Sequence, residues 1–252
     1  MTIQTDIHNA VLRITLNRPE ALNAFDIPDL QKLAGILTDA KSNPEVRAVT
    51  ITGTGRAFSA GADIKAMEQM SEEDFARAAS LYQELARISQ DLDKPMIAAI
   101  NGFALGGGLE IALMCDLRIA GKAAKLGLPD AYMGFSPTGG LTWLLTRMVG
   151  LSVAMDMALT TDMLDAGESL RVGLVSRVVE DGDLLPTAQE LAERMASFPK
   201  TGLRNIKRSF LAAADADFST VLTLEEAYDS DCFRSEETQA ALKAFIDSRK
   251  RK

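Results

Sequence analysis

Up to about Leu185 the sequence alternates between short strand-like segments and amphipathic helical segments. Residues 11–16, 48–52 and 96–100 have the composition of strands, and each is followed by a turn-forming segment. Residues 29–40 carry apolar side chains at the spacing of an amphipathic helix, and a long helix is expected over residues 72–92. Strands that are separated by helices need crossover connections, so this alternation predicts an α/β layered fold.

The C-terminal part has a different pattern, with helical spacing throughout and no expected strand. We place a boundary near Phe198-Pro199, which gives a core of residues 1–198 and a helical region of residues 199–252. The last helical segments carry apolar stripes, which are intramolecular core or, alternatively, a subunit contact. These stripes contain Leu222, Leu224, Ala227, Tyr228, Ala241, Leu242 and Phe245.

Composition and missing motifs exclude several classes of protein. The net charge of −8 argues against general nucleic-acid binding. No run of about 18 apolar residues is present, so we expect a soluble protein without a spanning helix. Cys115 and Cys232 alone predict reduced thiols in a cytoplasmic compartment. The single histidine, His8, argues against a Ser-His-Asp triad or a multi-histidine zinc site, and no dinucleotide or ATP phosphate-loop motif is present.

Three consecutive glycines, residues 106–108, lie between an expected strand ending at Asn101-Gly102 and an apolar helix. Glycines let a ligand approach the backbone, and a helix N-terminus offers free N–H groups. This combination suits an oxygen atom that becomes negative during a reaction. The alternative is that the glycines only allow the helix to pack tightly on the strand.

Glu110 follows within one turn and stands in the apolar run of residues 109–114. Such a helix is expected to be buried, and burial raises the pKa of a carboxyl group. Glu110 is therefore a candidate general acid or base. An ion pair with Arg118 is the structural alternative. A second glycine-marked loop, residues 53–65, also follows a strand and could supply another exposed N–H group.

Three segments resemble the signature segments of the crotonase (enoyl-CoA hydratase/isomerase) superfamily, in the same order and spacing. They are Asn17-Arg18-Pro19 with Ala21-Leu22-Asn23-Ala24, residues 57–64 (Ala-Phe-Ser-Ala-Gly-Ala-Asp-Ile) and residues 101–108 (Asn-Gly-Phe-Ala-Leu-Gly-Gly-Gly). Residues 147–150, 166–175 and 244–246 also match, so the resemblance covers nearly the whole chain.

The resemblance implies a crotonase-type spiral of ββα units with a C-terminal helical region that packs homotrimers, often paired into hexamers. It implies an oxyanion hole made of the N–H groups of Ala62 and Gly107. The acyl-CoA substrate would bind along these two residues and Ala60, Asp63, Ile64 and Lys65, mostly through the backbone. It implies no metal and no cofactor, because coenzyme A is part of the substrate.

Carboxylates decide the reaction in this family, whose hydratases use two glutamates around a water molecule. Glu110 matches the first, but Asp130 stands at the second position. Aspartate is shorter by about 1.5 Å, and an offset of about 1 Å can cost around a hundredfold in rate. Thr138 stands where dienoyl-CoA isomerases and dehalogenases have aspartate, and Ala62 stands where decarboxylases have histidine, so these branches are disfavoured.

We therefore predict reversible hydration of a 2-enoyl-CoA, with Glu110 activating water and Asp130 exchanging a proton at C2. The alternatives are a double-bond isomerase that uses one carboxylate and a non-catalytic acyl-CoA-binding scaffold. The acyl chain is not identified; residues that line its pocket or fill the core are Met67, Met70, Tyr132, Met133, Phe135 and Trp143. Ser248 replaces a lysine common in family hydratases, and the basic tail of residues 249–252 either is solvated or contacts CoA phosphates.

Overall fold

The computed structural model describes residues 3–250 and contains one six-stranded sheet in the order β1-β2-β3-β5-β7-β10. β1 and β2 form an antiparallel hairpin, and the other neighbours are parallel. The strands are β1 (Ile3–His8), β2 (Val11–Leu16), β3 (Ala48–Gly53), β5 (Met96–Ile100), β7 (Leu117–Gly121) and β10 (Arg177–Val179). The predicted strands at residues 11–16, 48–52 and 96–100 are confirmed.

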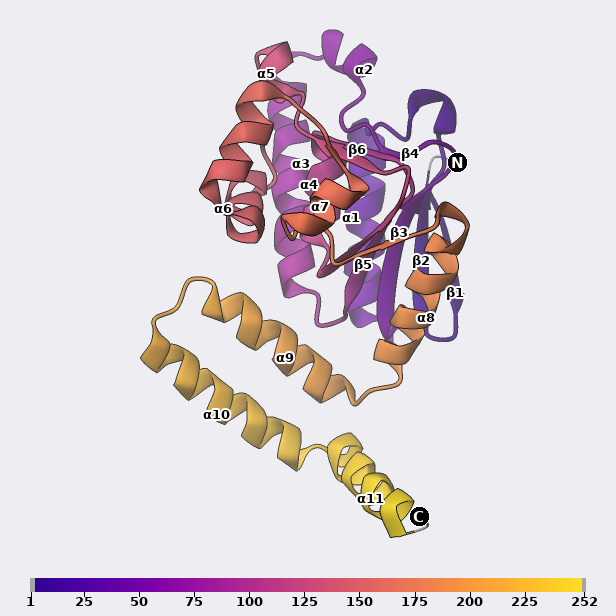
Figure 1. Ribbon diagram of the computed structural model, residues 1–252, viewed down its shortest axis with the longest axis vertical. Coiled ribbons are helices and arrows are strands. Elements are labelled where there is room, and N and C mark those ends of the chain that lie inside the picture. The colour runs from indigo at the N-terminus through magenta and orange to yellow at the C-terminus, as the bar shows by residue number, and fades with distance from the viewer. Residues whose placement is uncertain (1–2, 251–252) are drawn as a thin grey trace.

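A second sheet has four short strands in the order β4-β6-β8-β9. They are β4 (Ala57–Ser59), β6 (Phe103–Leu105), β8 (Lys125–Gly127) and β9 (Leu164–Asp165). β4, β6 and β8 each follow a strand of the large sheet and precede a helix, so the chain repeats a ββα unit. Each repeat brings the turn between a short strand and its helix to the same end of the molecule (Figure 1).

Helices cover both faces of the large sheet (Figure 1). α1 (Ile27–Ser42), α3 (Glu72–Asp91) and α4 (Gly107–Met114) pack into the larger core, where α4 is buried from Gly108 to Met114. α8 (Leu184–Ala196) covers the opposite face. The remaining helices of this part are α2 (Ile64–Glu68), α5 (Asp130–Met133), α6 (Leu141–Thr160) and α7 (Ala166–Arg171). The predicted α/β class and the predicted helices at residues 29–40 and 72–92 are confirmed.

The last three helices extend away from the sheets (Figure 1): α9 (Lys200–Ala213), α10 (Phe218–Arg234) and α11 (Glu236–Lys250). Ion pairs tie α9 to the core, with Lys207 Nζ 3.0 Å from Asp116 Oδ2. These helices leave large apolar side chains exposed, among them Ile206, Phe210, Phe218, Phe233 and Phe245. The outermost tail residues, 251 and 252, lie outside the described residues. Within residues 3–250, none of the helices combines the length and the apolar character that a membrane crossing requires.

Candidate active site

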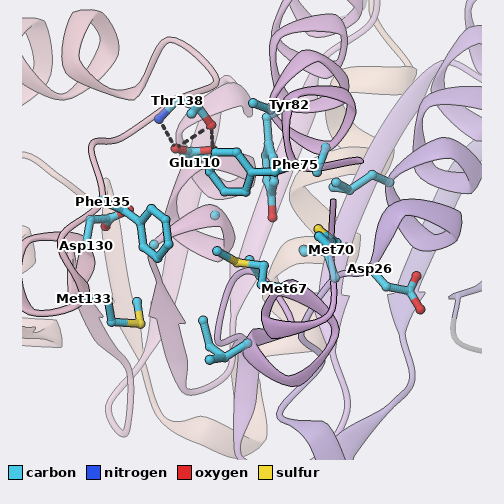
Figure 2. A pocket seen from close by; sticks show the side chains of 18 of the residues that line it. Asp26, Met67, Met70, Phe75, Tyr82, Glu110, Asp130, Met133, Phe135 and Thr138 are labelled. Atoms are coloured by element: carbon cyan, nitrogen blue, oxygen red, sulfur yellow. Dashed lines mark hydrogen bonds between the residues drawn. The ribbon is translucent and has the colours of Figure 1, made fainter. Parts of the chain in front are cut away.

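A cavity of about 270 Å³ opens beside the N-terminus of α4 (Figure 2). The segments that border it are the start of α1, the second and third signature segments, α2, α3 and the α5 region. Of the residues expected at the site, those that line this cavity are Ala60, Ala62, Ile64, Gly107, Glu110 and Asp130. The lining does not include Asp63 or Lys65.

Two asparagines of the signature segments hold the loop that leads to Ala62. Asn23 Nδ2 donates to the carbonyl oxygens of Thr54 and Ala57, each at 2.9 Å. Asn101 Nδ2 donates to the carbonyl oxygens of Gly55 and Ala57 at 3.0 and 3.1 Å. Because buried carbonyl groups need hydrogen-bond partners, these side chains fix the path of a loop that has no regular structure.

The backbone at Ala62 runs beside Phe25 as an isolated parallel bridge. Phe25 N–H donates to Gly61 O at 2.7 Å, and Asp63 N–H donates to Phe25 O at 2.8 Å. Successive peptide groups of an extended segment point to opposite sides, so the Ala62 N–H points away from Phe25. Gly61 has a φ of +93°, and a Cβ there would lie 2.9 Å from Gly107 N. The loop therefore crosses directly against the start of α4, and the two amide-bearing segments adjoin.

Asp63 binds other parts of the protein and does not line the cavity. Its Oδ1 accepts from the N–H groups of Lys65 and Ala66, which caps α2, and its Oδ2 accepts from Arg18 at 2.9 Å. The Lys65 side chain is exposed. Arg18 also donates to Ala24 O, so this guanidinium joins the first signature segment to the Ala62 loop.

Each glycine of the triplet lies in a different geometric environment. Gly106 has a φ of +49°, a conformation that favours glycine. A Cβ at Gly108 would lie 2.2 Å from Ser59 O, so α4 packs tightly on β4. Gly107 begins α4, and the N–H of a first helical residue has no acceptor within its helix. The triplet thus allows close packing of α4 on β4 and places the start of α4 at the cavity. That it stabilises a negative oxygen atom stays a prediction.

Glu110 is 3% exposed and lies with its carboxylate against the turn at Thr138 (Figure 2). Thr138 N–H donates to Oε1 at 2.7 Å, and Thr138 Oγ1 donates to Oε2 at 3.2 Å. Burial raises the pKa of Glu110 to about 7; the Thr138 hydrogen bonds oppose this shift, and the charge of Asp130 adds to it. The alternative ion pair with Arg118 is wrong, because that guanidinium donates to two backbone carbonyl oxygens, each at 2.7 Å.

Asp130 begins α5 and borders the same cavity. Its Oδ2 is buried and has no hydrogen-bond partner among residues 3–250, and burial raises the pKa of this carboxyl group. A Cβ at Gly106 would lie 3.7 Å from Oδ2, so the carboxyl group is next to the glycine loop. Two carboxyl groups with raised pKa values thus flank one space, which is suited to proton transfer at a bound molecule.

Several lining residues were not predicted from the sequence. Tyr82 is the main one: α3 was expected only as a long helix, and the available signal was a tyrosine next to the apolar residues that this helix buries. Phe75 stacks on Phe135 with ring centroids 5.6 Å apart, which joins α3 to the segment after α5. From the sequence, six residues could either line the pocket or fill the core. Four of them line the cavity, namely Met67, Met70, Met133 and Phe135, whereas Tyr132 and Trp143 do not.

Comparisons with known proteins agree over almost the full length. Residues 6–252 match the family model described as enoyl-CoA hydratase/isomerase. The chain is 38% identical to the short-chain-enoyl-CoA hydratase of Clostridium acetobutylicum, over 94% of this chain and 91% of that protein. It is 36% identical to the crotonyl-CoA hydratase of Syntrophomonas wolfei, over 93% and 91%. The crystal structure of an enoyl-CoA hydratase from Bacillus anthracis superimposes with a TM-score of 0.95 at 34% identity, covering 98% of this chain and 97% of that one.

Proposed function

The chain belongs to the enoyl-CoA hydratase/isomerase family, the crotonase superfamily, and we propose that it adds water reversibly to the C2–C3 double bond of a 2-enoyl-CoA. The predicted crotonase-type fold, a spiral of ββα units with a C-terminal helical region, is confirmed by the match to a solved hydratase. The observation that carries the proposal is the buried Glu110 carboxyl group, which shares one cavity with Gly107 at the start of α4.

The proposed oxyanion hole consists of the N–H groups of Ala62 and Gly107. Both hydrogen bonds strengthen when the thioester oxygen becomes an enolate oxygen, and each donor is worth about 3–4 kcal/mol of transition-state stabilisation. The adjoining positions of the two segments and the direction of the Ala62 N–H support this assignment. Acyl-CoA would approach along the segment from Ala60 to Lys65.

In the proposed reaction Glu110 accepts a proton from water as the water oxygen bonds to C3. The electrons of the C2–C3 bond move toward the thioester carbonyl, and the enolate forms. Asp130 then donates its proton to C2. Glu110 next releases one proton to solvent and Asp130 takes up one proton from solvent, which restores both carboxyl groups. A pKa of about 7 places Glu110 near neutral pH, where a general base can both accept and return a proton, and burial also raises the pKa of Asp130.

Asp130 fills the role in spite of its shorter side chain because of where the main chain places it. Its Oδ2 lies beside Gly106, next to the proposed oxyanion hole. The position supports hydration over a reaction that needs Glu110 alone. The relatives named hydratases act on short-chain enoyl-CoA and crotonyl-CoA by their names, so we propose a short acyl chain for this enzyme too.

We further propose a homotrimer, or a hexamer formed from two trimers, with the exposed apolar side chains of α9–α11 at the subunit contacts. Burying them would remove this apolar surface from water. The proposed location is the cytoplasm, with Cys115 and Cys232 as free thiols. The reaction as proposed uses no metal or separate cofactor.

The test is a panel of 2-enoyl-CoA thioesters of increasing chain length in oxygen-18 water and in deuterium oxide. Hydration places oxygen-18 at C3 and deuterium at C2, and Glu110→Gln nearly abolishes both while leaving CoA binding. Deuterium without oxygen-18 would indicate an isomerase instead. Tight binding of every thioester with no turnover would indicate a scaffold and would refute the proposal.

A further inference from the structure

Tyr82 is a polar group in the cavity for which the proposed reaction has no role. The residue is 6% exposed and comes from α3, and its side chain is directed into the cavity (Figure 2). Its hydroxyl oxygen, Oη, is buried and forms no hydrogen bond with any residue of the described chain, 3–250. Neither carboxyl group of the site forms a hydrogen bond with this oxygen.

The hydroxyl group of Tyr82 does not stabilise the fold, and phenylalanine at this position would stabilise it equally well. The ring packs in the buried stripe of α3 with Leu81 and Leu85, and a phenylalanine ring fills the same space. A buried hydroxyl group without a partner destabilises a protein. The hydrogen-bonding capacity of Tyr82 is thus available to whatever molecule occupies the cavity.

The surroundings keep this phenol protonated. Burial raises the pKa of Tyr82, and the negative charges of Glu110 and Asp130 raise it further. Tyr82 therefore offers a hydrogen-bond donor at neutral pH.

The Tyr82 hydroxyl group lies so close to Gly107 that both can donate a hydrogen bond to the same oxygen atom of a bound molecule. A Cβ built on Gly107 would lie 2.2 Å from Tyr82 Oη. Covalent geometry places a Cβ about 2.5 Å from the nitrogen of its own residue, so Oη is at most about 4.7 Å from Gly107 N. One oxygen atom can then lie about 2.9 Å from both donors.

We propose that Tyr82 Oη is a third hydrogen-bond donor to the thioester oxygen of the bound acyl-CoA, alongside the N–H groups of Gly107 and Ala62. This inference rests on the proposed acyl-CoA function. The hydroxyl would strengthen its hydrogen bond as the carbonyl oxygen gains charge, and so would stabilise the enolate. It also explains why residue 107 must be glycine, since a side chain there would displace the phenol.

The test compares Tyr82→Phe with the control Tyr228→Phe, which alters a tyrosine of α10 outside the cavity. Two ligands that cannot be hydrated are used: butanoyl-CoA and its thioether S-butyl-CoA, which lacks the carbonyl oxygen. Tyr82→Phe is expected to weaken butanoyl-CoA binding about tenfold and to leave the Kd of S-butyl-CoA unchanged. With crotonyl-CoA its kcat should fall about a hundredfold while KM changes much less. The melting temperature of the free variant should be equal to or above that of the wild type, since no protein hydrogen bond is lost.

Two results would overturn the inference: an unchanged kcat with an unchanged Kd for butanoyl-CoA, or an equal loss of affinity for both ligands, which would indicate a general packing role. Failure of the proposed hydration gives a different signature. In that case the wild-type enzyme hydrates no enoyl-CoA, yet the difference between thioester and thioether binding still reports on Tyr82.

Discussion

Replacing Glu110 by glutamine should inactivate the enzyme and, at alkaline pH, make it more stable. The folded-state pKa of about 7 lies above the ordinary value of 4.5. A carboxyl group with a raised pKa favours the folded state fully only below its unfolded-state pKa, and this contribution is lost as the pH rises through 7. Linkage gives a cost of ionising Glu110 in the folded protein of about 0.8 kcal/mol at pH 5 and about 3 kcal/mol at pH 8.

Glutamine keeps the local geometry while removing the charge. Its carbonyl oxygen can accept from Thr138 N–H, and its amide can donate to Thr138 Oγ1, in place of the contacts at 2.7 and 3.2 Å. The free energy of unfolding of Glu110→Gln should therefore exceed that of the wild type by about 2–3 kcal/mol more at pH 8 than at pH 5. For a chain of this size such a difference corresponds to roughly 5–10 °C in melting temperature.

The measurement is urea and thermal unfolding at both pH values and one protein concentration, paired with hydration assays. Glu190→Gln, which changes an exposed glutamate of α8, is the control and should show no such pH-dependent gain. If Glu110→Gln shifted stability equally at pH 5 and pH 8, the carboxylate would not be a buried charge. The argument for Glu110 as the tuned base would then fail.

Substitutions at three other residues test the remaining parts of the site. Asp130→Asn should lower kcat at least about a hundredfold, because it removes the proton donor. Asp130→Glu keeps a carboxyl group and should retain more activity. Equal kcat values for the two variants would exclude proton transfer by this residue. Thr138→Val removes the Oγ1 hydrogen bond that lowers the pKa of Glu110, so the acidic limb of kcat/KM should move to higher pH; an unmoved limb would separate Glu110 from that titration. Arg18→Met removes the ion pair to Asp63 and should lower kcat about tenfold or more by loosening the Ala62 loop, with wild-type kcat as the contrary result.

The elements with strong periodicity could be predicted from the sequence because burial alone produces their patterns. β3 and β5 are buried at almost every position, and α3 shows an amphipathic stripe, so both kinds of element are visible without tertiary information. Glu110 was identifiable for the same reason, as a charge within an apolar helix. Tyr82 and Phe75 were not, because they line the same cavity as Phe135 only through the packing of α3 against the α5 region. Likewise, the sequence alone does not show that the Asp63 side chain binds Arg18, which is 45 residues away along the chain.

Three features that weaken the fold border the cavity, whereas two other buried polar atoms without partners in the described part of the chain, Arg18 Nε and Ser169 Oγ, belong to residues outside its lining. Glu110 is a buried carboxylate whose raised pKa marks a desolvation cost, and Asp130 Oδ2 and Tyr82 Oη are buried without partners among residues 3–250. An unpaired buried polar atom typically costs about 1–3 kcal/mol. Glu110, Asp130 and Tyr82 border one space of about 270 Å³, beside the first N–H of α4. The free hydrogen-bonding capacity of Asp130 Oδ2 and Tyr82 Oη lies at the position proposed for the thioester and its attacking water, so a bound acyl-CoA would supply the partners that the free protein lacks.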